Sequence, residues 1–159
     1  MSDRSAARTA SFARALAEAG CSGEVRVLPE SSHTAAQAAA ALGCEPGAIA
    51  SSLVFLAGDE PLLVMTSGAH RVDTDLLSRE LGVPLVMARA KVVKEVTGQP
   101  IGGVSPIGHP APLRTIVDRS LQAYDELWAA AGSAASIFPI SFEDLVRITN
   151  GTPMQVADD

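Results

Sequence analysis

The sequence predicts an α/β domain of the α+β kind, with a mixed, largely antiparallel sheet flanked by short helices. Its two most strand-like segments are joined by a short turn, and its helical segments are short and closed by glycine or asparagine. Regular alternation of strands and helices is missing, which disfavours a doubly wound parallel fold. No repeat, low-complexity tract or linker interrupts the chain, so we expect residues 1–159 to form a single domain.

The chain begins with a predicted helix and a short strand. Residues 5–19 carry apolar residues at helical spacing, and Gly20 is placed to end that helix. Residues 25–28 alternate weakly between apolar and polar, which indicates a strand that Pro29 stops.

A second helix and a hairpin follow. Thr34-Ala35-Ala36-Gln37 matches a capping box, and Gly43 supplies the helix stop. After a turn at Pro46-Gly47, the β-rich segments 49–57 and 62–66 predict an antiparallel hairpin.

The rest of the chain alternates less regularly. Ser141-Phe142-Glu143-Asp144 opens a last helix that Asn150-Gly151 closes. The other predicted elements are helices over 72–81 and 90–96, ended by Gly82 and Gly98, and strands over 114–117, 127–131 and 136–140.

Composition limits the function classes. Apolar runs such as 53–57 are too short to span a bilayer, and no continuous hydrophobic segment marks a signal peptide, so we expect a cytoplasmic protein. Cys21 and Cys44 predict neither a disulfide framework nor a zinc site. The net charge of −6 argues against broad phosphate neutralisation on DNA, although it permits a protein that touches only the end of an RNA.

Residues 98–112 form the most unusual segment. They hold four glycines and four prolines, which together make a loop that is irregular yet stiff. Such a loop can present backbone amides to a carbonyl or ester of a ligand, as the wall of an oxyanion hole does. The alternative is a long surface connection.

The familiar catalytic motifs are missing. His33, His70 and His109 have no Asp or Glu placed by sequence to orient them, so a Ser-His-Asp triad is not supported. His70 lies beside Arg71, and the two together are candidates for a phosphate contact. The sequence has no nucleophile elbow, His-Glu-x-x-His, P-loop or dinucleotide fingerprint, so we expect no metal and no cofactor.

Four segments in order carry a resemblance to a known family. They are 33–43 (HTAAQAAAALG), 49–55 (IASSLVF), 102–108 (GGVSPIG) and Ala131-Gly132 with 142–149 (FEDLVRIT). In these segments the chain resembles the YbaK/EbsC family, the free-standing relatives of the editing domain of bacterial prolyl-tRNA synthetase. The resemblance spans nearly the whole chain from about residue 5, and the loop and the strand are its most specific parts.

The resemblance implies a mixed sheet flanked by helices and a pocket for the aminoacylated 3′ end of tRNA. Members remove small misattached amino acids such as cysteine or alanine, often from tRNA for proline, and rely on the substrate's own groups instead of a protein nucleophile. Prolyl-tRNA synthetase is an implied partner. The site residues so implied are Ser51, Gly102 and Gly103 for catalysis and His33, Thr34, Ser52, Ser105, Pro106, Gly108 and Gly132 for substrate binding.

Two positions depart from the family pattern. The family strand usually carries a lysine where this chain has Ser51, so a positive charge is replaced by a neutral hydroxyl. After Gly132, where some relatives carry a charged residue, residues 133–136 are small and neutral. Three interpretations remain open: a different aminoacyl group is recognised, another cation (Lys91, Lys94 or Arg71) substitutes in space, or hydrolysis is lost and the chain only binds.

The leading hypothesis is an aminoacyl-tRNA deacylase that acts in trans. Its rival is a non-catalytic module that binds an aminoacyl group or a tRNA end, and a third hypothesis is a structural partner of a synthetase.

Overall fold

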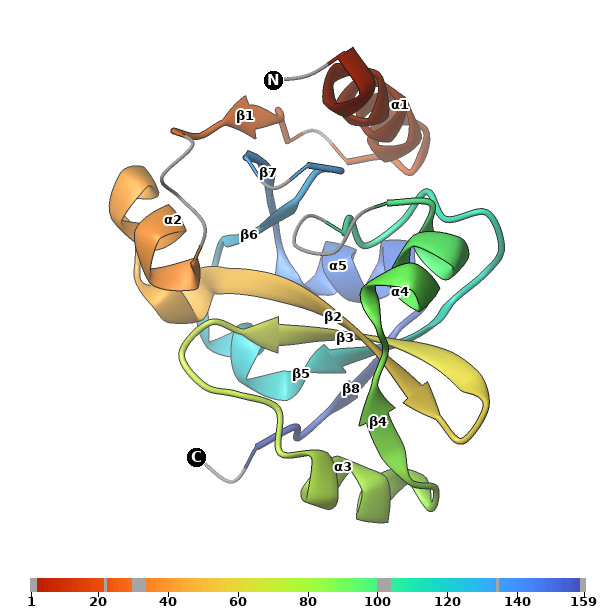
Figure 1. The fold of residues 1–159 in the computed structure, drawn as a ribbon. Coiled ribbons are helices and arrows are strands. Elements are labelled where there is room, and N and C mark those ends of the chain that lie inside the picture. The colour runs from red at the N-terminus through yellow and green to blue at the C-terminus, as the bar shows by residue number, and fades with distance from the viewer. Residues whose placement is uncertain (1–2, 22, 30–33, 100–103, 134, 158–159) are drawn as a thin grey trace.

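The computed structural model describes residues 3–21, 23–29, 34–99, 104–133 and 135–157. Within these ranges the strands form one eight-stranded sheet in the order β1-β7-β6-β2-β3-β5-β8, with β4 paired to β2 (Figure 1). Of the seven strand pairs described, four are antiparallel and three are parallel, which confirms the predicted mixed sheet. The strands are β1 (Arg26–Val27), β2 (Ile49–Ala57), β3 (Glu60–Ser67), β4 (Leu85–Met87), β5 (Arg114–Asp118), β6 (Leu127–Ala130), β7 (Ser136–Ile140) and β8 (Thr152–Met154).

The predicted helices form, and their end signals act as expected. The Thr34 hydroxyl accepts from the Gln37 N–H at 3.1 Å, and the Gln37 side chain accepts from the Thr34 N–H at 3.0 Å, which completes a capping box. The helices are α1 (Asp3–Glu18), α2 (Ala35–Leu42), α3 (Thr74–Leu81), α4 (Ala90–Thr97) and α5 (Phe142–Thr149), with short 3-10 turns η1 (Pro46–Ala48) and η2 (Arg119–Ala123). No helix among the described residues has the length and apolar character needed to cross a membrane.

Two strands, β4 and β8, are not predicted from the sequence. β4 adds a short antiparallel partner to the second half of β2, and β8 adds a parallel partner to β5. Each has three residues, too few for an alternating pattern to stand out, and Val86 and Met87 of β4 are more than half exposed.

One face of the sheet is covered by α1, α4 and α5. Phe12 and Leu16 of α1, Val93 of α4 and Leu145 of α5 pack with buried residues of the central strands. Val104, which follows the glycine pair of the loop, is buried in the same cluster. This face therefore carries the glycine-proline loop.

The opposite face is covered at its two ends by different helices. Ala38 and Ala39 of α2 pack on Ile49 and Trp128, while Leu77 of α3 packs with Phe55 and other strand residues. Figure 1 shows α2 and α3 at opposite ends of β2 and β3. The middle of this face, between the two helices, is where a cavity opens.

Candidate functional site

A cavity of about 440 Å³ opens on the sheet face between α2 and α3. That volume lies within the range of small-molecule pockets. Its walls combine apolar side chains with hydroxyl, imidazole and guanidinium groups. The lining residues are Ala35, Ser51, Leu53, Phe55, Thr66, Ser67, Gly68, His70, Arg71, Val72, Thr74 and Met87.

Strand alternation selects which side chains reach this cavity. Ser51, Leu53 and Phe55 are two residues apart on β2, so their side chains lie on one face of the sheet. Ser51 is paired directly with Thr66 of the antiparallel neighbour β3. Ser51, the position of the missing lysine, is thus next to the polar end of β3.

Gly68 lines the cavity at a point where the chain passes very close to Ala35 and Pro46. Its N–H donates to the Ile49 carbonyl at 2.8 Å, which extends the β2–β3 pairing by one residue. A Cβ atom built on Gly68 would lie 2.5 Å from both the Pro46 carbonyl oxygen and the Ala35 Cβ. The close packing of three chain segments therefore leaves no room for a side chain here.

We predict that Gly68→Ala destabilises the fold by about 1–3 kcal/mol, the usual cost of forcing a methyl group into filled space. One of the two close atoms is backbone and cannot rotate away. Urea unfolding of the variant and of the wild-type chain measures the difference. An unchanged unfolding midpoint would contradict the close packing at Gly68.

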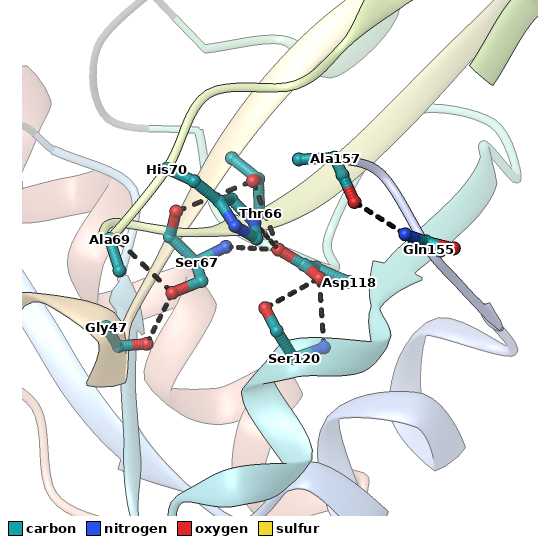
Figure 2. A network of polar contacts seen from close by, with 9 residues as sticks. All are labelled: Gly47, Thr66, Ser67, Ala69, His70, Asp118, Ser120, Gln155 and Ala157. Atoms are coloured by element: carbon teal, nitrogen blue, oxygen red, sulfur yellow. Dashed lines mark hydrogen bonds and ion pairs between the residues drawn. The ribbon is translucent and has the colours of Figure 1, made fainter. Parts of the chain in front are cut away.

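His70 leaves the end of β3 and meets a buried carboxylate. Its Nε2 atom lies 2.5 Å from Oδ2 of Asp118, the last residue of β5 (Figure 2). The side chains of His70 and Asp118 are 8% and 2% exposed, so the pair is shielded from solvent. Figure 2 shows Thr66, Ser67 and Ser120 converging on the same carboxylate.

Backbone N–H and hydroxyl groups donate hydrogen bonds to the Asp118 carboxylate. Oδ2 accepts from the Ser67 N–H at 2.9 Å and the Thr66 hydroxyl at 3.3 Å, and Oδ1 accepts from the Ser120 N–H at 3.0 Å and hydroxyl at 2.8 Å. Burial alone raises the pKa of Asp118, but hydrogen bonds from Ser67, Ser120 and His70 outweigh it and hold that pKa below its ordinary value. Asp118 is therefore ionised at neutral pH.

An ionised Asp118 fixes the tautomer of His70. A carboxylate only accepts hydrogen bonds, so the short contact requires Nε2 of His70 to carry the proton. In the neutral ring the proton-accepting nitrogen is then Nδ1. The sequence expectation that no carboxylate orients a histidine is wrong for His70, because parallel pairing of β3 with β5 brings together residues 48 positions apart.

A second and smaller cavity lies on the other side of the pair. It measures about 230 Å³, and it is lined by His70, Asp118, Arg119, Ser120, Gln155 and Ala157. His70 thus borders both cavities, and an arginine lines each of them: Arg71 on the Ser51 side and Arg119 on the other.

The described part of the glycine-proline loop is held by its own hydrogen bonds. Ser105 is fully buried; its N–H donates to Gln99 Oε1 at 2.7 Å, and its hydroxyl donates to the Ile107 carbonyl at 2.7 Å. Nε2 of His109 donates to the Ser105 carbonyl at 2.8 Å, and burial lowers the pKa of His109. Ser105 therefore fixes the loop, and its predicted substrate contact stays a prediction.

A groove of about 420 Å³ separates this loop from α1. Arg8 and Ser11 of α1 face Gln99, Gly108 and His109 across it. The groove lies on the sheet face opposite the Ser51 cavity, since Phe12 and Val104 both belong to the cluster that α1 covers. Its Gln99 and Ser105 side chains already bond each other at 2.8 Å.

The structure separates the two adjacent serines of the predicted site. Ser51 lines the cavity between α2 and α3, whereas the Ser52 hydroxyl donates to Met65 Sδ at 3.2 Å on the opposite face. Thr34 is exposed and caps α2 just before Ala35, a cavity residue. His33, Gly102 and Gly103 lie outside the described residues.

The remaining predicted residues lie around α1 and the loop. Pro106 is buried, Gly108 is exposed, and Gly132 is buried with φ +100° and accepts from Arg8 Nε at 2.9 Å. None of these three lines the Ser51 cavity.

Of the three cations considered as substitutes for the lysine, Arg71 lines the Ser51 cavity. Lys91 and Lys94 belong to α4, which packs on the other face. In the part of the chain that the structure describes, no group of three His, Cys, Asp or Glu side chains is arranged to hold a metal ion.

Proteins similar in sequence include a bacterial protein without an assigned function and a proline–tRNA ligase. The protein YwhH of Bacillus subtilis strain 168, itself uncharacterised, is 31% identical over 123 residues, which cover 77% of this chain and 78% of that protein. The proline–tRNA ligase of Geobacter sp. strain M21 is 32% identical over 97 residues, which cover 60% of this chain and 17% of the ligase.

The fold of this chain matches a solved structure over its full length. A crystal structure described as a candidate trans-editing enzyme for prolyl-tRNA synthetase superposes with a TM-score of 0.91 at 34% identity and covers 100% of this chain and 99% of that one. The model of the aminoacyl-tRNA editing domain family matches residues 29–148. The chain therefore belongs to the aminoacyl-tRNA editing domain family, as the resemblance in its four segments predicts.

Proposed function

We propose that the protein is an aminoacyl-tRNA deacylase that acts in trans and in the cytoplasm. It hydrolyses the ester of small misattached amino acids such as cysteine or alanine, with tRNA for proline as the expected carrier. The observation that carries the proposal is the family match over residues 29–148, which contains every residue lining the Ser51 cavity.

The chemistry of the Ser51 cavity suits an aminoacylated ribose. Ser51 offers a hydroxyl group for a ribose or amine contact, and Leu53 and Phe55 form an apolar wall for a small side chain. The Thr66 and Ser67 hydroxyls, which donate to Asp118 and to the Gly47 carbonyl, add polar character to the same cavity. The groove beside the glycine-proline loop is the weaker candidate, because Ser51, the position of the family lysine, does not line it and its Gln99 and Ser105 side chains bond each other.

Local charge supports contact with the end of an RNA. Although the net charge is −6, Arg71 and Arg119 line the two cavities that meet at His70. Guanidinium groups suit bidentate contacts with phosphate, so these two arginines are candidates for contacts with phosphates next to a 3′ end. Binding of this kind does not need a strongly basic surface.

The reaction proposed is hydrolysis without a protein nucleophile. Water attacks the ester carbonyl, the bond to the ribose oxygen breaks, and free amino acid and uncharged tRNA leave. Positioning of the ester and the substrate's own ribose hydroxyl supply the acceleration. The resemblance gives ester binding to Gly102 and Gly103, but the described loop residue Val104 packs on the sheet face opposite the Ser51 cavity, so the reaction proposed in that cavity does not use them.

A non-catalytic module that binds the aminoacyl end is the second candidate function. Ser51 in place of the family lysine is the observation that favours it, because the cavity then lacks an ammonium group at this position. Such a module would bind a charged tRNA end and leave its ester intact.

The test is a deacylation assay of the purified chain with tRNA for proline charged with cysteine, alanine or serine. We expect release of at least one of these amino acids well above the spontaneous rate, with prolyl-tRNA as the control substrate. Release at the spontaneous rate for all three would refute the enzymatic proposal. Binding of a charged tRNA without release would establish the second candidate.

A further inference from the structure

The smaller cavity beside His70 has no part in the proposed reaction. It measures about 230 Å³ and lies between the start of η2 and the segment that follows β8, which supplies Gln155 and Ala157. His70 belongs to the lining of this cavity and to the lining of the Ser51 cavity. The two cavities are therefore neighbours.

The arginine of the smaller cavity is available to a ligand. Arg119 is exposed, and within the part of the chain that the structure describes it makes no hydrogen bond or ion pair. The adjacent Asp118 does not hold it, because both carboxylate oxygens accept from Ser67, Ser120 and other donors (Figure 2). The charge of the carboxylate is thus matched inside the protein, whereas the guanidinium charge is left for a ligand.

Two other polar groups of this cavity act as acceptors. The Ser120 hydroxyl donates its hydrogen to Asp118 Oδ1 at 2.8 Å, so toward a ligand it can only accept. Nε2 of Gln155 donates to the Ala157 carbonyl at 2.9 Å, which leaves Oε1 as an acceptor. A fitting ligand has an anionic group for the arginine and hydroxyl donors for these oxygens. A ribonucleotide carries both, in its phosphate and its ribose hydroxyls.

We propose that the smaller cavity is a second RNA subsite, in which Arg119 binds the phosphate between the terminal adenosine of the tRNA and the nucleotide before it. This inference rests on the proposed function, in which the Ser51 cavity takes the aminoacylated adenosine. Because His70 borders both cavities, adjacent nucleotides of one strand can occupy them together. The volume is below the range of complete ligand pockets, so it suits a phosphate with its ribose and leaves the base outside.

The subsite makes the protein bind a strand in preference to a free aminoacyl nucleoside. A chain of net charge −6 gains little from its overall field when it approaches RNA, so a cation placed next to the site matters more. One hydrogen-bonded contact between charged groups is worth about tenfold or more in affinity. Arg119 therefore has a measurable share in substrate binding.

Binding of two non-hydrolysable analogues tests the proposal. One is adenosine that carries alanine through a 3′ amide in place of the ester, and the other is the dinucleotide cytidylyl-adenosine with the same amide. We expect the wild-type chain to bind the dinucleotide about tenfold more tightly than the nucleoside, and Arg119→Ala to lose most of that gain. Arg119→Lys keeps the charge without the bidentate geometry and should retain part of the gain.

Arg114→Ala is the matched control. Arg114 is also an exposed arginine, but it begins β5 at the end opposite Asp118 and lines neither of the two cavities. Its removal makes the net charge more negative by the same amount and should leave the gain unchanged. An equal loss of gain in Arg114→Ala and Arg119→Ala would overturn the subsite, because net charge alone would then explain the effect.

A second measurement uses the wild-type chain alone. Rising salt concentration should weaken binding of the dinucleotide, which carries a phosphate, and should change binding of the uncharged-sugar nucleoside analogue little. Equal affinity for both analogues at low salt would overturn the inference, and so would a gain that Arg119→Ala keeps in full.

The deacylation assay keeps this inference separate from the proposed function. A wild-type chain that deacylates tRNA but gains nothing from the second nucleotide would refute the subsite and leave the proposed function standing. A chain that shows the gain in affinity without deacylation would support the subsite and refute the enzymatic proposal.

Discussion

Asp118→Asn is expected to lower the free energy of unfolding at pH 7 by about 3 kcal/mol, because it breaks a buried charged network. Both oxygens of Asp118 accept hydrogen bonds, two at Oδ1 and three at Oδ2. An asparagine in either orientation turns an NH₂ group toward at least two of these donors. Those donors then lose their acceptor while they remain buried, which is the costly part of the change.

The same residue predicts how stability depends on pH. The pKa of Asp118 in the folded chain lies below its ordinary value, while in the unfolded chain it is about 3.9. Its stabilising contribution is therefore complete above about pH 4 and is lost as the pH falls through the lower pKa of the folded state. The difference in unfolding free energy between wild type and Asp118→Asn should shrink over that acidic range.

Urea unfolding at pH 7 and at several values below pH 4 measures both effects. Asp144→Asn is a suitable control, since it removes a carboxylate from an ion pair with Arg147 that is about half exposed. Equal stability of Asp118→Asn and wild type at pH 7 would contradict the hydrogen-bond network described around Asp118.

Most of the local structure can be predicted from the sequence because its signals are local. The Thr34 and Gln37 capping box and the glycine that follows residue 42 fix both ends of α2 within ten residues. The hairpin of β2 and β3 is equally local, since its strands are joined by a turn at Gly58 and Asp59. β4 lacks such a signal, and its pairing with β2 is set by the tertiary fold.

The candidate site is predicted less completely, for two physical reasons. Alternation along a strand directs Ser51 and Ser52 to opposite faces, a consequence that the sequence pattern already contains once 49–57 is taken as a strand. The contact of His70 with Asp118 depends on tertiary structure, because it forms only if β3 and β5 are neighbouring strands whose carboxyl ends lie side by side. That pairing is parallel and joins segments far apart in the sequence, so no local sequence pattern predicts it.

Ser51→Lys is the change with the largest expected effect on activity that leaves the His70–Asp118 pair intact. A lysine at this position extends a four-carbon stem and an ammonium group toward a cavity that Arg71 and His70 already line. It occupies space needed by the aminoacyl group and adds like charge beside Arg71. We expect kcat/KM for deacylation to fall about tenfold or more, which corresponds to about 1.4 kcal/mol of transition-state stabilisation.

Ser51→Met and Ser51→Ala separate the causes of that loss. Methionine has a similar length and no charge, so a loss shared by the lysine and methionine variants identifies occupied space, and a loss confined to lysine identifies charge. Alanine removes only the hydroxyl and should change kcat/KM less than either. If the wild-type chain is inactive and Ser51→Lys gains deacylation, hydrolysis depends on an ammonium group at this position, and the second candidate function, binding without turnover, describes the natural chain.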